Sequence, residues 1–345
     1  MFRRTNVPYS TLFELTLRCN MRCIHCGSSA GIRREEELST VEWQKICDQL
    51  AELHCNQITL LGGEPFLRKD WFDIAQHIRN LGIKVTMITN GYNIDTTIVR
   101  QLRSLEPYTI AISLDGATAE THDSIRGMHG SFTRCINSLH LLREAEVNTT
   151  IITTVHKKNL KELPDIITLI LNRNIAWQIQ IANPIGRFPD NLILSEEEFY
   201  SLAMFIASTR KHYTTKEVPI TAAHCIGYHS SILPNLIIGQ WRGCQAGIYT
   251  LGIQSNGRVK GCLSLPDDFI EGDIKEKSIS ELWNNPRFAS YNRKFTRDDL
   301  TNGCRNCFHG RSCRGGCLSV STSVTGKKHG DPYCLYRIEK EMIPK

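Results

Sequence analysis

Cys19-Asn20-Met21-Arg22-Cys23-Ile24-His25-Cys26 is the stretch around which the 345-residue chain is organised. Its cysteines are spaced C-x3-C-x2-C and follow an apolar run, 11–17, which is predicted to be a strand. Three thiolates can hold three irons of a 4Fe–4S cube, which leaves the fourth iron open to bind and activate a substrate. The alternative is a structural zinc site, but such sites favour two pairs of ligands, and no obvious fourth ligand lies nearby unless His25 serves.

The cysteine spacing resembles the signature of the radical SAM superfamily. That resemblance implies that Cys19, Cys23 and Cys26 hold a 4Fe–4S cluster whose open iron is chelated by the amino and carboxylate groups of S-adenosylmethionine (SAM). One electron from the cluster would then cleave SAM to a 5′-deoxyadenosyl radical. His25 fills a position where many relatives place an aromatic residue against the adenine, and a histidine can stack there as well.

Composition restricts the setting in which the chain works. Hydrophobic residues make up 41% of the chain, which suits a globular protein, and no apolar run is long enough to cross a membrane. The basic stretch Met1–Asn6 has no apolar region behind it, so no secretory signal is predicted and a cytoplasmic location is expected. Fourteen cysteines in such a compartment favour metal binding over disulfides. The net charge of +6 comes from interspersed residues, so nucleic-acid binding is not expected.

Strand and helix patterns alternate along the first two thirds of the chain. Strands are predicted at 11–17, 58–61, 84–88, 108–114, 149–155 and 177–181, with helices between them. This alternation predicts an α/β fold with a parallel sheet, and six units, fewer than a closed barrel needs, predict a partial (β/α)6 TIM-like barrel. We expect a core over residues 1–215, a bridging segment over 216–240 and a loop-rich C-terminal domain over 241–345.

The loops after the predicted strands carry further candidate residues, because ligands of parallel α/β folds sit at the carboxyl ends of the strands. The motif Gly62-Gly63-Glu64-Pro65 follows the second strand and resembles the radical SAM motif that binds the SAM amino group. The third strand ends at Asn90, and the fourth leads into Ser113-Leu114-Asp115-Gly116 and then Arg126. The resemblance implies that Ser113 contacts the SAM carboxylate or ribose and that Arg126 reaches the carboxylate. Asp115 is either part of this site or a carboxylate that caps a turn.

The C-terminal third contains a second array of cysteines. Cys244 and Cys262 bracket a stretch, 252–259, that is predicted to be a hairpin with an Asn-Gly turn. The array continues as Cys304-x2-Cys307-x5-Cys313-x3-Cys317 and ends at Cys334. Two zinc sites are one reading of these short spacings.

The complete array resembles the seven-cysteine signature of the SPASM domain, which carries two auxiliary 4Fe–4S clusters. The resemblance therefore implies three 4Fe–4S clusters in all. The first auxiliary cluster would take Cys244, Cys262 and Cys317. The second would take Cys304, Cys307, Cys313 and Cys334.

Cys225 is the spare cysteine nearest to this array. It could be the fourth ligand of the first auxiliary cluster, a hydrogen-atom donor that faces the substrate, or an inert buried thiol. Cys47, Cys55 and Cys135 are predicted to be small buried hydrophobic residues.

The resemblance implies an oxidoreductase that modifies a ribosomally made peptide, forming a thioether, carbon–carbon or carbon–oxygen cross-link. Peptide epimerisation, a sulfatase-maturase-like oxidation and a small-molecule reaction are alternatives, although Leu263 replaces the aspartate of the sulfatase-modifying relatives. A non-catalytic iron–sulfur or zinc scaffold that binds a partner is the alternative from another class. The first predicted strand begins near Thr11, which leaves no room for an N-terminal leader-binding domain. A separate leader-recognition protein is therefore expected, together with a flavodoxin or ferredoxin as reductant.

Overall fold

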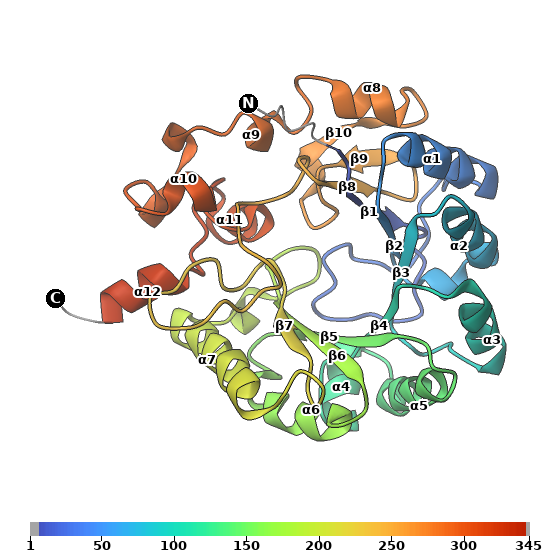
Figure 1. Cartoon of the computed structure of the whole chain (residues 1–345), viewed down its shortest axis with the longest axis horizontal. Helices are drawn as coiled ribbons and strands as arrows, with labels where there is room; N and C mark the ends of the chain where they lie inside the picture. The colour runs from blue at the N-terminus through green and yellow to red at the C-terminus, as the bar shows by residue number, and fades with distance from the viewer. Residues whose placement is uncertain (1–6, 343–345) are drawn as a thin grey trace.

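A single ten-stranded sheet organises the computed structural model, which describes residues 7–342 (Figure 1). The strand order is β10-β9-β8-β1-β2-β3-β4-β5-β6-β7, and every neighbouring pair from β8 to β7 is parallel. The parallel strands of the first two thirds are β1 (Ser10–Glu14), β2 (Gln57–Leu61), β3 (Lys84–Thr89), β4 (Thr109–Ser113), β5 (Thr149–Val155), β6 (Ile175–Ile181) and β7 (Ile220–Ala222). The parallel α/β fold predicted from the sequence is thus confirmed.

Helices connect these strands and surround the outside of the curved sheet (Figure 1). They are α1 (Thr40–Glu52), α2 (Trp71–Asn80), α3 (Thr96–Leu105), α4 (Ala119–Arg126), α5 (Ser131–Glu144), α6 (Leu163–Ile170) and α7 (Glu196–His212). Ser39 and Glu42 form a capping box at the start of α1, and Ser195 and Glu198 form another at the start of α7.

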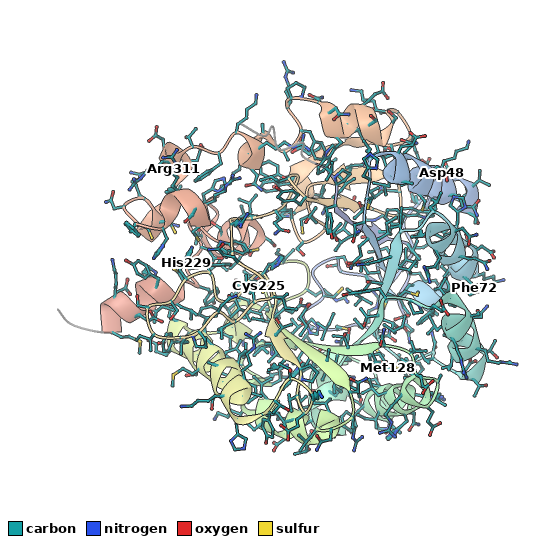
Figure 2. All side chains as sticks on the ribbon, in the orientation of Figure 1. Asp48, Phe72, Met128, Cys225, His229 and Arg311 are labelled. Carbon is teal, nitrogen blue, oxygen red and sulfur yellow. The ribbon has the colours of Figure 1, made fainter. Side chains whose placement is uncertain are left out.

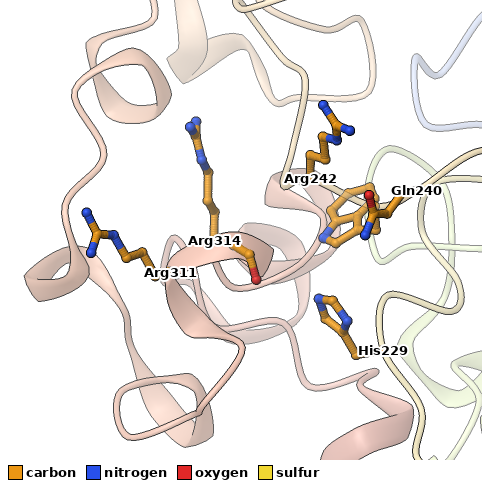
Figure 3. Close-up of a pocket in the computed structure, with 7 residues that line it drawn as sticks. His229, Gln240, Arg242, Arg311 and Arg314 are labelled. Atoms are coloured by element: carbon orange, nitrogen blue, oxygen red, sulfur yellow. The ribbon is translucent and has the colours of Figure 1, made fainter. Parts of the chain in front are cut away.

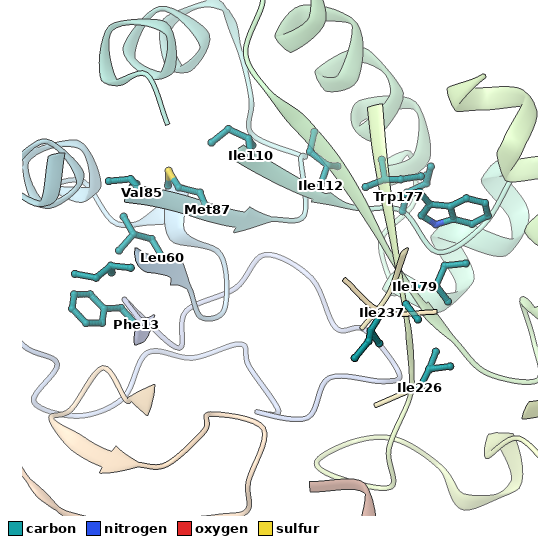
Figure 4. Packing of buried hydrophobic residues seen from close by; sticks show 14 of the residues in the cluster. Phe13, Leu60, Val85, Met87, Ile110, Ile112, Trp177, Ile179, Ile226 and Ile237 are labelled. Atoms are coloured by element: carbon teal, nitrogen blue, oxygen red, sulfur yellow. The ribbon is translucent and has the colours of Figure 1, made fainter. Parts of the chain in front are cut away.

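The core lies between the sheet and these helices (Figure 4). Leu60, Val85, Ile110 and Trp177 come from four different strands, and each side chain is 0% exposed. Burying one such side chain contributes about 1.5–3 kcal/mol, so the hydrophobic strands hold the sheet and place its carboxyl edge.

The structure differs from the prediction at two elements of the first two thirds. The six predicted strands are present, but β7 adds a seventh, and it lies inside the segment expected to bridge two domains. Helix α4 was not predicted. Thr118 caps its start by accepting from the backbone N–H of Thr121, and Gly127 ends it in the left-handed conformation with φ +62°.

The C-terminal third extends the sheet instead of folding apart from it. Strand β8 (Thr250–Ile253) pairs with β1, and β9 (Arg258–Lys260) and β10 (Ile270–Asp273) add two antiparallel strands. The predicted hairpin is confirmed as β8–β9, and its Gly257 has φ +98°. Short helices follow: α8 (Ile279–Asn284), α9 (Ser290–Arg293), α10 (Gly310–Cys313), α11 (Leu318–Thr325) and α12 (Leu335–Met342).

Across residues 7–342, none of the helices combines the length and apolar character that a membrane crossing requires. The N-terminal stretch that was interpreted as lacking a secretory signal, residues 1–6, lies outside the described part of the chain.

Candidate functional site

The first cysteine motif lies in the loop between β1 and α1, at the carboxyl edge of the parallel sheet. Backbone hydrogen bonds attach it to two other segments. The N–H groups of Arg22 and Ile24 donate to the carbonyls of Arg126 and Ile125, and the N–H of Arg187 donates to Cys26. Cys23 is buried, whereas Cys19 and Cys26 are half-buried. The loop is therefore held by the end of α4 and by the segment after β6.

The two glycines after β2 allow this loop to approach the sheet edge. A Cβ on Gly62 would lie 2.3 Å from the carbonyl oxygen of Thr16, and one on Gly63 would lie 2.2 Å from that of Arg18. The N–H groups of Gly63 and Glu64 donate to the same two carbonyls, at 2.7 and 2.8 Å. These glycines therefore allow the backbone after β2 to pack closely against residues 16–18, which directly precede Cys19.

Glu64 lies at the sheet edge with its carboxylate fully buried. One oxygen accepts from the Thr89 hydroxyl at 2.8 Å and the other from the Asn90 N–H at 2.8 Å. Burial raises the pKa of Glu64 to about 7, and the backbone hydrogen bond from Asn90 opposes that rise. The Asn90 side chain donates in turn to Asn20 inside the cysteine motif, at 2.8 Å. The GGE motif and the end of β3 are thus joined to the cysteine loop.

Asp115 and Arg126 form a buried ion pair beside Cys23. The Arg126 Nη2 lies 2.5 Å from Asp115 Oδ2, and its Nη1 donates to Cys23 Sγ at 3.7 Å. Burial opposes the ionisation of Asp115, but the Arg126 charge outweighs it and lowers the pKa of Asp115. The other carboxylate oxygen accepts from the Thr154 N–H at 2.8 Å. Asp115 thus has more than the turn-capping role considered from the sequence, because it fixes a guanidinium against a cysteine of the motif.

Three imidazoles surround this ion pair. His25 Nε2 lies 3.4 Å from Asp115 Oδ2, His122 Nδ1 accepts from the Asp115 N–H at 3.2 Å, and the ring of His156 lies 5.9 Å from that of His25. Burial lowers the pKa of all three histidines to about 4. They are therefore neutral near pH 7 and can accept or donate hydrogen bonds without adding charge.

The side chains at this edge fit a SAM-binding iron–sulfur site. Among residues 7–342, no hydrogen-bond partner is present for the buried atoms Asn20 Nδ2, His25 Nδ1, Arg126 Nε and His156 Nε2. Buried polar atoms of this kind cost about 1–3 kcal/mol each unless a ligand or water satisfies them. Ser113, the last residue of β4, is half-buried. Donors and thiolates gathered in one place match the carboxylate of SAM and the irons of a cluster.

The described residues contain no group of three His, Cys, Asp or Glu side chains arranged to hold a single metal ion.

The C-terminal cysteines interact as two sets. Burial raises the pKa of Cys317 well above its usual value, and the charges of Cys244 and Cys225 add to the rise. Burial also raises the pKa of Cys244, and the charge of Cys262 adds to that rise. The charges of Cys225, Cys244 and Cys262 thus act within one group of thiols that includes Cys317, and their ligation of one cluster stays a prediction.

The second set is equally distinct. Burial raises the pKa of Cys304 to about 12, with contributions from Cys334 and Cys307, and burial together with Cys334 raises that of Cys313 to about 12. The charges of the four cysteines expected to hold the second auxiliary cluster thus raise one another's pKa values.

Two aromatic side chains connect the two sets. Trp241 Nε1 donates to the Cys313 carbonyl at 3.1 Å, and its ring lies 4.5 Å from that of Tyr228. The Tyr228 hydroxyl donates to Asp331 at 2.6 Å and accepts from the Cys317 N–H at 2.9 Å. Asp331 is 3% exposed, so this bridge is part of the interior.

Sequence reasoning missed several residues of these sites. Arg187, which donates to the Cys23 carbonyl at 3.2 Å, follows the sixth predicted strand, where the position of the loop was the available signal. His156, Tyr228, Trp241 and Asp331 had no spacing that marked them. Cys47, Cys55 and Cys135 are buried in the core, as predicted.

Known proteins resemble the chain in both of its parts. The radical SAM superfamily matches residues 13–170, and the SPASM iron–sulfur cluster-binding domain matches residues 244–308. An AdoMet-dependent heme synthase of Methanosarcina barkeri is 30% identical over 99% of this chain and 100% of that protein. The mycofactocin maturase MftC of Mycobacterium tuberculosis is 29% identical over 96% of this chain and 84% of that protein.

Solved structures share the fold. Streptococcus suis SuiB bound to its precursor peptide SuiA superposes with a TM-score of 0.78 at 18% identity, over 95% of this chain and 76% of SuiB. The AdoMet-bound enzyme anSMEcpe superposes with a TM-score of 0.70 at 18% identity, over 96% of this chain and 94% of that one. The sequence matches, the cysteine loop at the sheet edge and the two C-terminal cysteine sets agree with one another, and the chain belongs to the radical SAM superfamily of enzymes, with a C-terminal SPASM domain.

Proposed function

We propose that this enzyme abstracts a hydrogen atom from a ribosomally made peptide and uses the resulting carbon radical to form a thioether, carbon–carbon or carbon–oxygen cross-link. The observation that carries the radical step is the cysteine loop held at the carboxyl edge of the sheet, with the Asp115–Arg126 pair against Cys23. The peptide substrate is supported by likeness to the maturase MftC and to the fold of SuiB.

The residues of the sheet edge would hold SAM and the first cluster. Cys19, Cys23 and Cys26 would ligate three irons, and a SAM molecule cleaved there supplies the 5′-deoxyadenosyl radical. Glu64 would accept from the SAM amino group, with Gly62 and Gly63 shaping the approach. The remaining contacts would come from His25, Asn90, Ser113, Asp115 and Arg126. Because Arg126 is already paired with Asp115, its free Nε is the atom available to a carboxylate.

The two C-terminal cysteine sets would hold auxiliary 4Fe–4S clusters, which gives three clusters in all. We assign Cys225 as the fourth ligand of the first auxiliary cluster, beside Cys244, Cys262 and Cys317. The charge of Cys225 acts on Cys317, and burial raises the pKa of Cys225 to about 11, so an unligated thiol there would stay protonated. These clusters would take up or pass on the electron released when the product bond forms.

Heme formation is the second candidate, and one observation favours it. The AdoMet-dependent heme synthase of M. barkeri matches this chain over its full length at 30% identity, whereas the chain spans 84% of MftC. On this reading a tetrapyrrole takes the place of the peptide while the radical step stays the same.

The expected partners follow from the chemistry. A peptide substrate could be delivered by a separate leader-recognition protein, and the cluster electron would come from a flavodoxin or ferredoxin in the cytoplasm. Tight binding of a leader peptide by the enzyme alone would count against the recognition protein.

The radical step is tested on protein reconstituted anaerobically with iron and sulfide. With SAM and dithionite, we expect 5′-deoxyadenosine by mass spectrometry from the wild type and none from the Cys19/Cys23/Cys26→Ala triple variant. If the protein instead holds zinc and no iron and yields no product, the enzyme hypothesis is refuted and the hypothesis of a non-catalytic binding scaffold remains.

The substrate is tested in the same assay by adding precursor peptides or iron-coproporphyrin III, the compound in the name of another relative. A peptide that increases 5′-deoxyadenosine and loses hydrogen atoms supports the peptide reading. An increase with the porphyrin alone, together with a change in its absorption spectrum on binding, would replace it with the tetrapyrrole reading.

A further inference from the structure

Two adjoining hollows form one cleft on the C-terminal part of the molecule. They have volumes of about 510 and 290 Å³ and share Gln240, Arg242 and Arg314 in their walls. Figure 3 shows the residues that line the larger hollow. One wall comes from the segment before β8 and the other from the α10–α11 region. Figure 3 shows the Arg242 and Arg314 side chains extending in the same direction from these two walls.

The cleft is strongly basic. Arg242, Arg293, Arg311 and Arg314 line it, and its lining contains no Asp or Glu. Within residues 7–342 none of these four arginines takes part in an ion pair. Glu271 acts on the half-buried Arg293 from outside the cleft, so the charges of Arg242, Arg311 and Arg314 are the ones that attract anions and steer an acidic surface toward it.

The cleft also lies next to both C-terminal cysteine sets. Cys244 of the first set lines the smaller hollow, and Arg311 and Arg314 flank Cys313 of the second set in the chain. Trp241 lines the larger hollow and donates to the Cys313 carbonyl. A partner seated here would therefore come closer to the auxiliary clusters than one bound on the helical side of the barrel.

We propose that this cleft is the docking surface for an acidic one-electron carrier protein of the flavodoxin or ferredoxin kind. The proposal rests on the proposed function, because it requires clusters at the two cysteine sets. One electron would leave the reduced cofactor of the carrier and enter the cluster held by Cys304, Cys307, Cys313 and Cys334. The carrier is oxidised by one electron, the cluster is reduced by one electron, and no bond or proton is exchanged.

The shape of the cleft favours a protein over an enclosed small ligand. Gln240, Arg242 and Arg311 are exposed, and Figure 2 shows Arg311 at the periphery of the molecule. Sites for small molecules usually bury most of their ligand, whereas transient electron-transfer contacts are small and depend on charge. Phe308 is 83% exposed beside His309, whose ring stacks on His229 in the cleft wall at 4.2 Å. One exposed aromatic side chain, Phe308, thus lies beside the basic surface and could pack against a protein partner.

The test is anaerobic stopped-flow reduction of the reconstituted enzyme by a reduced acidic flavodoxin, followed by bleaching of the cluster absorbance. The variant is R242E/R311E, because both side chains are exposed and neither makes a hydrogen bond to the described residues. The matched control, R100E/R103E, reverses two exposed charges on α3. We expect the second-order rate constant at low ionic strength to fall about tenfold or more in R242E/R311E only, with a weaker salt dependence.

Reduction by photoreduced deazariboflavin, a small uncharged donor, separates docking from cluster damage. The proposal requires R242E/R311E to keep the wild-type rate with this donor. An unchanged rate with flavodoxin would overturn the proposal, and so would an equal loss with both donors. The proposal would also be overturned if the only defect of R242E/R311E were weaker binding of a small polyanion such as iron-coproporphyrin III. A wild type that exchanges electrons with flavodoxin but makes no 5′-deoxyadenosine would refute the proposed function without refuting the docking surface.

Discussion

The ion pair between Asp115 and Arg126 keeps two opposite charges away from water, with side chains 0% and 8% exposed. The variant D115N would leave the guanidinium buried without a counter-charge, while the amide oxygen could still accept from Thr154. We expect the free energy of unfolding, measured by anaerobic urea titration, to fall by about 3 kcal/mol. Glu120 is exposed on the same helix as Arg126, so E120Q should stay within about 0.5 kcal/mol of the wild type. An equally small effect in D115N would show that the pair is not the source of stability.

Cys225 gives the second prediction at the scale of single residues. If it ligates the first auxiliary cluster, C225A opens one iron, so the electron paramagnetic resonance signal of that cluster changes and some iron is lost. The control C47A removes a thiol that is 0% exposed in α1 and should leave the cluster signals intact. Unchanged spectra in C225A combined with lost turnover would instead indicate a hydrogen-atom donor. Unchanged spectra and turnover would indicate an inert thiol.

The sequence predicted candidate site residues where their spacing along the chain is itself the signal, as it is for cluster-binding cysteines. The cysteines of each short motif are close in the chain, and local spacing alone groups them. Arg187 reaches Cys23 from 164 residues away, and Tyr228 reaches Asp331 from 103 residues away. Such partners meet only when the sheet brings distant loops together, so no local pattern could predict them.

At the scale of elements, the approach of the β2 loop to the cysteine loop gives a sharp test. A methyl group at position 63 would lie 2.2 Å from the Arg18 carbonyl oxygen, so G63A must push the cysteine loop away from the sheet edge. We expect the purified variant to lose about four irons per chain, those of one cube, and to make no 5′-deoxyadenosine. The control G27A lies next to Cys26, where an added Cβ would lie 3.9 Å from the Ile185 side chain, an ordinary contact. G63A with full iron content would contradict this role for the glycine.

Helices and strands whose apolar residues recur at a regular spacing were predicted, and elements too short to show such a spacing were not. The six long strand–helix units follow from alternating apolar patterns and from capping boxes such as Ser39–Glu42. Strand β7 has three residues, too few to show a period, and α4 has eight residues, of which only three are buried. Both depend on their neighbours for stability, because isolated short elements are marginal.

At the scale of the whole molecule, the C-terminal third completes the sheet of the first two thirds. Strand β8 covers the edge of β1, and Ser255 donates to the buried Glu14 through its N–H at 3.2 Å and its hydroxyl at 2.9 Å. The Leu38 N–H donates to the Ser255 carbonyl at 2.7 Å, next to the cysteine loop. The pairing of β1 with a strand more than two hundred residues later could not be predicted, because the division into domains suggested a boundary there.

This pairing predicts that a fragment of residues 1–240 will not fold alone. Without β8–β10, the edge of β1 would present unpaired backbone groups and Glu14 would lose two donors, so the fragment should aggregate or bind a hydrophobic dye. Circular dichroism and size-exclusion chromatography measure this outcome. Adding residues 241–345 as a separate chain should restore part of the soluble, iron-binding protein, since the missing strands are then supplied in trans. A monomeric 1–240 fragment with a cooperative unfolding transition would instead mean that β1 needs no partner on that side, and that the first cysteine loop is held by the barrel alone.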